Sequence, residues 1–315
     1  MVSKIFIDGE AGTTGLQIRE RLAGRRDLEV ISIAQDKRKD IDERARLLNA
    51  ADIAILCLPD DAARESVALI DNGTTRVIDA SSAFRVHGDW AYGFAEMDKG
   101  QSEVIARARF VSNPGCYPQG VIATVRPLIE AGLLPSGYPL TVNAISGYSG
   151  GGKQMIAEYE AAGAAASHFM PYGLTFAHKH VPEMTAYTKL AQAPLFVPSV
   201  GDYAQGMMSF VPLQLSHLGV VPKGVELHAA IADHFAAIPN SFVEVAPYVE
   251  MARSPELDPQ IYNNTNTMKL HVFASDARAQ AVLVAVYDNL GKGASGAAVQ
   301  NLNLMLGADP HTGLH

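Results

Sequence analysis

The chain has 315 residues, 48% of them hydrophobic, and a formal net charge of −8 at pH 7. This length exceeds what one ordinary hydrophobic core fills, so roughly two domains are expected. The negative balance, with no dense Lys/Arg stripe, argues against nucleic acid as a partner. No run of about 18 apolar residues and no N-terminal leader pattern stands out, so we expect a soluble cytoplasmic protein without a membrane partner. The two cysteines, Cys57 and Cys116, argue against a disulfide framework and agree with a reducing compartment.

The first segment combines a strand, a glycine turn and a helix. Residues 4–8 predict a short strand, and the apolar residues Leu16, Ile18 and Leu22 continue at helical spacing. Between them lies GEAGTTG, whose glycines recur at every third position. Such glycines allow a tight turn and the close approach of a pyrophosphate to the helix N-terminus. We expect a dinucleotide-binding turn, with a plain turn as the alternative; its contact residues would be Gly9, Ala11, Gly12, Thr13, Thr14 and Gly15.

The second predicted strand, residues 28–33, ends in a basic cluster. An NAD site usually carries an acid here for the ribose 2′-hydroxyl, whereas cations receive the 2′-phosphate of NADP. The sequence offers Ser32, Lys37, Arg38 and Lys39, with Asp36 as the nearby acid. The cluster favours NADP(H) as the cofactor, unless it is only a solvated loop face.

The next elements alternate between helix and strand. We predict helices over residues 42–50 and 60–70, and strands over residues 53–58, 76–80 and 110–112. Alternation of this kind implies right-handed crossovers and a parallel sheet. Arg85 follows one strand end, where its guanidinium could clamp a phosphate or carboxylate, although an unpaired surface arginine is an equal alternative.

The motif SNPGCYPQG, residues 112–120, is the strongest catalytic signal. Pro114 and Gly115 suit a sharp turn, and apolar residues at helical spacing begin soon after Cys116. Cys116 is therefore expected at or just before a helix N-terminus. The dipole and the unpaired first-turn amides of that helix would stabilise a thiolate and an oxyanion. Cys57, inside an apolar run, is expected to be an inert buried residue.

Beyond this helix the pattern changes. Residues 140–146 predict a strand, and the glycine-rich residues 147–153 that follow, ending at Lys153, could form an anion nest or a mobile connection. A helix rich in Ala and Glu should run up to residue 166, and residues 294–306 have helical spacing. A largely antiparallel sheet is predicted from the segments 207–215, 225–232, 241–245, 269–274 and 280–287.

Tyr172, His178, His180 and Glu183 crowd into twelve residues. Acyl transfer to a thiolate needs an acid, and a histidine is the natural partner because it titrates near neutrality. His-x-His with a nearby glutamate also suits a metal ion, and structural histidines are a further alternative. Spacing alone does not show which imidazole faces Cys116.

Taken together, these motifs resemble one enzyme family. GEAGTTG, SNPGCYPQG, SGYSGGGK, HKHVPE and the closing DNLGKGASGAAVQNLNLMLG are similar to those of the N-acetyl-γ-glutamyl-phosphate reductase family, in its shorter bacterial type. The resemblance spans nearly the whole chain. It implies an α/β fold: a Rossmann-type domain over residues 1–115, a second α/β domain with a largely antiparallel sheet over residues 116–293, and a C-terminal helix over residues 294–315 that returns to the first domain. That arrangement would be like glyceraldehyde-3-phosphate dehydrogenase, as in the aspartate-semialdehyde dehydrogenase-like superfamily.

The resemblance also implies roles for particular residues. Cys116 would be the nucleophile, His180 the acid/base with His178 second, and Glu183 would orient the histidine. Gln300 and Asn301 match a closing motif near the cofactor. Lys153 stands where longer family members tend to have arginine. The expected contacts with a small acyl-phosphate substrate are Arg85, Asn113, Ser146, Lys153 and Tyr172.

The expected reaction is the NADPH-dependent reduction of N-acetyl-γ-glutamyl phosphate to a semialdehyde through a cysteine thioester, without a metal ion. A thiolate, a dinucleotide loop and an imidazole fit this chemistry better than proteolysis, which has no use for a dinucleotide. Three alternatives remain open. They are a reductase of aspartyl or aminoadipyl phosphate, a phosphorylating aldehyde dehydrogenase, and a non-catalytic NADP-binding redox regulator. The family resemblance favours a homodimer or homotetramer.

Overall fold

The computed structural model describes residues 2–248 and 257–315, and the chain divides into two compact units. Unit 1 comprises Met1–Ala95, Gly100–Gly115 and Ala294–His315. Unit 2 comprises Glu96–Lys99 and Cys116–Gly293. Each unit has its own sheet, and each is described by itself below.

Unit 1 is built on a parallel sheet with the strand order β2-β1-β3-β4-β6-β5. The chain moves from β1 to β2 on one side and to β3 on the other, so β1 and β3 flank the point at which the strand order reverses. In open sheets of this kind, ligands bind beyond the carboxyl ends of the strands at that point. The strands are β1 (Ser3–Asp8), β2 (Leu28–Ile31), β3 (Ile53–Leu56), β4 (Arg76–Asp79), β5 (Ala91–Tyr92) and β6 (Phe110–Ser112).

The predicted alternation of helices and strands in unit 1 is confirmed, with ends that differ by one or two residues. The core forms where apolar strand residues such as Phe6, Ala54 and Val77 pack against Leu48 of α2. The parallel register pairs Ile5 with Ile53. The short strand β5 and helix α4 escaped prediction. The helices are α1 (Thr13–Leu22), α2 (Ile41–Ala50), α3 (Asp60–Ala68), α4 (Gln101–Arg107) and α9 (Gly296–Leu306).

Unit 2 is built on a mixed sheet with the order β11-β12-β13-β10-β7-β9-β8. Among the described residues, β11 pairs with β12 and β7 with β9 in parallel, and the other neighbours are antiparallel. The largely antiparallel sheet that the sequence predicts is therefore present. Its strands are β7 (Thr141–Gly147), β8 (Phe169–Pro171), β9 (Leu195–Gly201), β10 (Met207–Gln214), β11 (Val243–Val245), β12 (Met268–Ser275) and β13 (Gln280–Tyr287).

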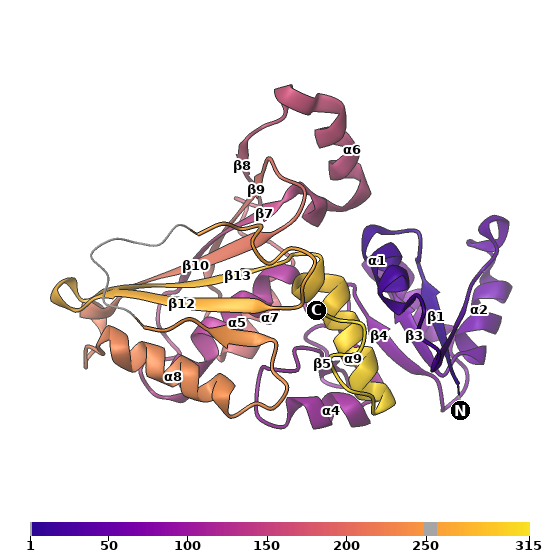
Figure 1. The fold of residues 1–315 in the computed structure, drawn as a ribbon, viewed down its shortest axis with the longest axis horizontal. Coiled ribbons are helices and arrows are strands. Elements are labelled where there is room, and N and C mark those ends of the chain that lie inside the picture. Colours follow the sequence, from indigo (N-terminus) through magenta and orange to yellow (C-terminus); the bar gives the residue numbers. More distant parts are fainter. Residues whose placement is uncertain (1, 249–256) are drawn as a thin grey trace. The chain divides into compact units, whose positions relative to one another are not determined.

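Two long helices, α5 (Cys116–Glu130) and α8 (Gly224–Ala236), pack on one face of this sheet (Figure 1). The strand predicted over residues 225–232 is wrong, because that segment lies within α8. The buried residues Leu227, Ile231 and Phe235 recur every fourth position, which is helical spacing, and the Glu226 carboxylate accepts a hydrogen bond from the Lys223 amide at the helix start.

Three other features, two in unit 2 and one at the C-terminal helix of unit 1, differ from the sequence prediction. Helix α6 (Gly152–Ala162) ends at Gly163, which has φ +50°, so the predicted helix up to residue 166 is too long. Helix α7 (Val181–Thr188) was not predicted. The C-terminal helix α9 is preceded by a π-helical turn, Gly291–Ser295.

Candidate functional site

The glycine turn between β1 and α1 has the backbone that a phosphate cradle requires. Gly9 has φ +87°, and a Cβ there would collide with the Cys57 carbonyl, so the position needs glycine. The Thr13 hydroxyl is buried and finds no hydrogen-bond partner among the described residues. An orphaned hydroxyl at the start of α1 is a group that a phosphate oxygen could satisfy. The residues present therefore fit a dinucleotide.

A cavity of about 470 Å³ opens beside this turn, within unit 1. It lies beyond the ends of β1 and β3, as the strand order leads one to expect. Its wall carries three cationic residues, Arg38, Lys39 and Arg44. Arg44 is buried and bonded to Asp8, whereas Arg38 and Lys39 are exposed. The remaining lining is Asp8, Gly9, Glu10, Ala11, Ile33, Ile41, Leu58, Ala62 and Glu65.

Glu10 is a functional candidate that the sequence analysis missed. Its buried carboxylate accepts a hydrogen bond from Arg19 at 2.7 Å and one from Ser32 at 3.4 Å, and it lies 3.9 Å from Arg38. Ser32 and Arg38, two predicted NADP contacts, therefore meet around this acid. Lys37 lies beside them in the sequence, in an exposed 3₁₀ turn. The signal was present in GEAGTTG, but spacing could not show that Glu10 turns towards the second strand.

Arg85 and Asn113 form one buried network in unit 1. The Arg85 guanidinium donates to the carbonyls of Asn113 and Ala80, each at 3.1 Å, so Arg85 is not a loose surface arginine. Burial raises the pKa of nearby Asp79 to about 6, although hydrogen bonds from Ser81 and the charge of Arg85 act in the opposite direction. Asn113 donates to the Ala294 carbonyl and accepts from Asn301.

The predicted cofactor residues Gln300 and Asn301 lie on α9. Both side chains are buried. Asn301 donates to the Gly93 carbonyl at 2.9 Å as well as to Asn113, so it ties α9 to two loops of unit 1.

Cys116 is the first residue of α5, as the sequence predicts, and its side chain is half-buried. Gly293 packs against it, since a Cβ at that position would lie 3.0 Å from Cys116 Cβ. Cys57 contrasts with it. Desolvation, together with the charges of Asp79 and Asp8, raises the pKa of Cys57 to about 12, although the residue as a whole is half-buried. Cys57 is thus the unreactive thiol.

Three phenols surround the start of α5. Burial raises the pKa of Tyr172 to about 12 and those of Tyr117 and Tyr287 well above the usual value, and the charge of Cys116 contributes to all three shifts. The three side chains therefore stay protonated at neutral pH. The Tyr117 hydroxyl donates to the Ser199 carbonyl at 3.0 Å, and the Tyr287 hydroxyl donates to the Cys116 carbonyl at 2.6 Å.

Both predicted histidines pack against Tyr117, the neighbour of Cys116 in the chain. Ring centroids lie 5.9 Å apart for His180 and 6.4 Å for His178, and Tyr172 lies against His178 at 5.7 Å. His180 is buried and occupies the N-cap position of α7 without a side-chain capping hydrogen bond, whereas His178 is half-buried. The structure thus brings Cys116, Tyr172 and the His pair together around one aromatic ring.

The two histidines differ in one decisive contact. The His180 backbone amide donates to His178 Nδ1 at 3.1 Å. Because an amide only donates, this Nδ1 accepts, and the His178 proton resides on Nε2. Glu183, in the first turn of α7, is buried, and its charge together with burial raises the pKa of Tyr187 to about 12.

The remaining predicted substrate contacts, Ser146 and Lys153, differ in their exposure to solvent. Ser146 is buried at the end of β7, and its hydroxyl donates to the Gly147 carbonyl. Lys153 is exposed near the start of α6.

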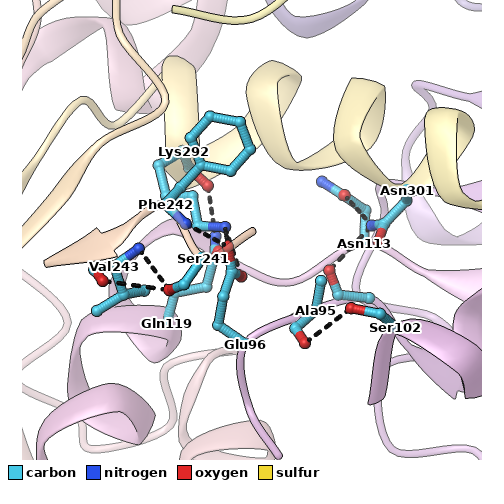
Figure 2. Close-up of polar contacts among 11 residues, drawn as sticks. Ala95, Glu96, Ser102, Asn113, Gln119, Ser241, Phe242, Val243, Lys292 and Asn301 are labelled. Atoms are coloured by element: carbon cyan, nitrogen blue, oxygen red, sulfur yellow. Dashed lines mark hydrogen bonds and ion pairs between the residues drawn. The ribbon is translucent and has the colours of Figure 1, made fainter. Parts of the chain in front are cut away.

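A second group that the sequence analysis missed is a buried ion pair in unit 2, between Lys292 and Glu96 (Figure 2). Both side chains are 1% exposed, and the Lys292 Nζ to Glu96 Oε2 distance is 2.7 Å. Glu96 also accepts from the Phe242 amide, while Gln119 of α5 donates to the Lys292 carbonyl at 2.8 Å (Figure 2). Only three-dimensional folding joins these four segments, so no local sequence signal could have found the cluster.

Two further features are absent from the described ranges. No group of three or more His, Cys, Asp or Glu residues in residues 2–248 and 257–315 is placed to hold a metal ion. No helix in these same ranges has the length and apolar character to cross a membrane.

Comparison with protein families gives two matches that together span most of the chain. Residues 4–105 match the semialdehyde dehydrogenase NAD binding domain, and residues 116–289 match the semialdehyde dehydrogenase dimerisation domain. Among solved structures, aspartate semialdehyde dehydrogenase II from Vibrio cholerae, complexed with ASA, has a TM-score of 0.71 at 15% identity, covering 97% of this chain and 98% of that one. This likeness shows the fold.

Curated relatives are much closer in sequence. A protein of Chelativorans sp. named N-acetyl-gamma-glutamyl-phosphate reductase is 67% identical over 306 residues, which is 97% of this chain and 99% of the relative. A Nostoc protein named N-acetyl-gamma-glutamyl-phosphate reductase 2 is 54% identical over 320 residues, with 99% of both chains covered.

Proposed function

This chain belongs to the semialdehyde dehydrogenase family and, within it, to the N-acetyl-gamma-glutamyl-phosphate reductases, and on that premise we propose which reaction it catalyses. The reaction is the NADPH-dependent reduction of N-acetyl-L-glutamyl 5-phosphate to N-acetyl-L-glutamate 5-semialdehyde and phosphate, a step of arginine biosynthesis in the cytoplasm. The observation that carries the proposal is a half-buried cysteine at the first residue of α5, next to Tyr117, whose ring contacts two histidines.

Cys116 is the proposed nucleophile. Its thiolate attacks the acyl carbonyl, the bond to phosphate breaks, and the acyl group remains on sulfur as a thioester. The helix dipole and the first-turn amides of α5 favour negative charge at this place, first on sulfur and then on the carbonyl oxygen. Pro118 lacks an amide hydrogen, so it contributes no donor to that turn.

His180 is the proposed acid. The departing phosphate needs a proton, and a histidine can supply it at neutral pH. Protonation of His178 at Nδ1 would oppose the amide hydrogen of His180, which already points at that atom. We therefore assign the main role to His180, with His178 and Glu183 orienting it.

The substrate is an anion, so its pocket needs local cations and donors rather than a positive net charge. Tyr172 stays protonated beside Cys116 and can donate to the substrate. The further proposed contacts are Arg85, Asn113, Ser146 and Lys153. Of these, the exposed Lys153 and the buried Arg85 are the two cations that could pair with a carboxylate or phosphate.

When bound in unit 1, a nicotinamide cofactor would supply the hydride that reduces the thioester. The C–S bond then breaks, so that the aldehyde leaves and Cys116 returns to its thiolate form. The chain's own part is to hold the pyrophosphate at Gly9, Ala11, Gly12, Thr13, Thr14 and Gly15. We assign NADP(H) rather than NAD(H), because Ser32 and Arg38 both lie beside Glu10 after the second strand, and Lys37 precedes Arg38 in the chain. Gln300 and Asn301 are proposed to support the same site from α9.

Arg38 tests the cofactor assignment. We expect Arg38→Ala to raise KM for NADPH by roughly tenfold or more, the range for a lost charge-assisted hydrogen bond, and to leave KM for NADH almost unchanged. Arg46→Ala is the matched control, since Arg46 is an exposed arginine of α2 that pairs with Glu43 and does not line the cavity. Equal losses with both cofactors would overturn the assignment of Arg38.

The reaction itself is tested in reverse, by absorbance of the reduced nicotinamide, with N-acetylglutamate semialdehyde, phosphate and NADP. We expect phosphate-dependent NADPH formation with this substrate and little with aspartate semialdehyde. Cys116→Ser should lower the rate by a factor of at least about 10³ and leave NADP binding intact, while Cys57→Ser remains active. Activity with aspartate semialdehyde alone would move the assignment to a neighbouring reductase. If folded protein that binds NADP forms no NADPH with either substrate, the result would favour a non-catalytic redox regulator.

The dimerisation domain of unit 2 supports self-association, and we propose a homodimer or a homotetramer.

A further inference from the structure

Tyr287 is buried in the centre of unit 2, where a phenylalanine would fill the same space without the cost of burying a hydroxyl. It lies at the end of β13, paired with Met207 of β10 on one side and Met268 of β12 on the other, and it is 0% exposed. A buried hydroxyl without a hydrogen bond is costly, so its partners indicate what it does.

Both of its closest partners belong to the first turn of α5. The Tyr287 hydroxyl donates to the Cys116 carbonyl at 2.6 Å and accepts from the Gly120 amide at 3.1 Å. These are the two backbone groups that a helix joins in its first hydrogen bond, from residue i+4 to residue i. The phenol therefore bridges the opening turn of the helix that begins with the nucleophile.

Gly120 makes this approach possible. A Cβ at residue 120 would lie 2.9 Å from the Tyr287 hydroxyl oxygen and 2.7 Å from Ser209 Oγ. Any larger residue would push the phenol away from the turn. The combination of Gly120 and Tyr287 thus builds one contact from α5 and β13.

We propose that Tyr287 is a positioning residue for Cys116: its hydroxyl fixes the first turn of α5 and strengthens the amides that stabilise the thiolate and the oxyanion. The inference rests on the proposed role of Cys116 as nucleophile. The phenol polarises the peptide that joins Cys116 to Tyr117, because a hydrogen bond to a carbonyl makes the amide hydrogen of the same peptide a better donor. That hydrogen belongs to Tyr117, in the turn beside the sulfur.

A second contact holds the same turn from another side. Gln119 donates to the Lys292 carbonyl (Figure 2). Gly293, which follows Lys292 in the chain, packs on Cys116. Lys292 is itself fixed by its ion pair with Glu96 (Figure 2). Because these contacts also hold the backbone of Cys116, the Tyr287 hydroxyl changes how strongly the amides of the turn donate hydrogen bonds, and not only the geometry of the turn.

The pH dependence of Cys116 alkylation by iodoacetamide measures the effect without substrate or cofactor. In Tyr287→Phe we expect the midpoint of that profile to rise by about 0.5–1 pH unit, the size of one modest hydrogen bond. The groups that share the surroundings of Cys116 are Tyr117, Tyr172, His178 and His180, and all remain in the variant. Mass spectrometry of the Cys116 peptide separates it from Cys57, whose pKa of about 12 keeps it unmodified.

Tyr138→Phe is the matched control. The Tyr138 hydroxyl is also a buried bridge in unit 2, accepting from the Gln214 amide at 2.7 Å and donating to the Gln214 carbonyl at 3.5 Å. A merely structural role for Tyr287 predicts that both variants lose similar stability and keep the wild-type alkylation profile, and this result would overturn the proposal.

Gly120→Ala keeps the test decisive if Tyr287→Phe fails to fold. Its added Cβ should displace the Tyr287 hydroxyl and shift the alkylation midpoint in the same direction. An unshifted profile in folded Gly120→Ala would count against the proposal. Loss of the proposed function would look different, since wild-type protein would then fail the reductase assay whatever its alkylation profile.

Discussion

His178 and His180 have nearly the same neighbours, so their roles must be separated by replacements that respect their contacts. Asparagine can offer its side-chain oxygen where His178 Nδ1 accepts from the His180 amide. We therefore expect His178→Asn to lower kcat by less than about tenfold, whereas His180→Asn removes the proton donor and should lower kcat by about 10²-fold or more. Rate measurements with saturating NADPH decide this, with fluorescence titration of NADPH as the control for cofactor binding. The opposite order of losses would make His178 the acid.

Some residues of the candidate site could be predicted from the sequence, and others could not. Cys116 could be predicted because a proline-glycine turn and helical spacing fix its place at a helix start, and both signals are local. Glu10, Tyr287 and Lys292 could not, because their importance depends on partners distant in the sequence. Tyr287, for example, acts on a turn that lies about 170 residues earlier, as the separation of 171 residues in its bond to Cys116 shows.

At the scale of elements, the prediction is accurate where hydrophobic period and turn chemistry agree. In unit 1 the strand, glycine turn and helix around Gly9 reinforce one another, and the boundaries follow within one or two residues. In unit 2 the segment 225–232 is short, apolar and alanine-rich, so strand and helix patterns overlap there. The buried residues Leu227, Ile231 and Phe235 recur at helical spacing and identify the segment as part of α8. Phe235 lies beyond the predicted segment, so that segment alone did not contain the full pattern.

The pairing of strands within a sheet is harder to predict from the sequence than the strands themselves. The strand β9 (Leu195–Gly201) was not predicted, although it pairs with β7 in parallel and with β8 antiparallel. Parallel neighbours require long crossovers, and no local turn signal records them. The prediction of a largely antiparallel sheet therefore identified the character of unit 2 without its strand order.

At the scale of the whole molecule, the chain passes between the two units at residues 95/96, 99/100, 115/116 and 293/294. Glu96 and Lys292 each lie within two residues of such a passage, and both belong to unit 2. Burial lowers the pKa of Lys292, and the charge of Glu96 acts against that shift. Burying two charges costs free energy of desolvation, which their mutual attraction offsets. The contribution of the pair to the free energy of unfolding is therefore measured by replacing each partner alone and then both together.

We expect Lys292→Met to lower the free energy of unfolding by about 3–5 kcal/mol, because the Glu96 carboxylate stays buried after its counter-charge is lost. The double variant Glu96→Gln/Lys292→Met should recover much of this loss, since no buried charge then remains at the pair. Urea denaturation followed by far-UV circular dichroism measures the effect. Lys269→Met is the control, because Lys269 pairs with Glu244 at 2.8 Å in the same unit but with 22% and 55% of the two side chains exposed, and such pairs contribute about 0–1 kcal/mol. If Lys292→Met were no more destabilising than Lys269→Met, the buried pair would not be holding the segment that carries Gly293 against Cys116.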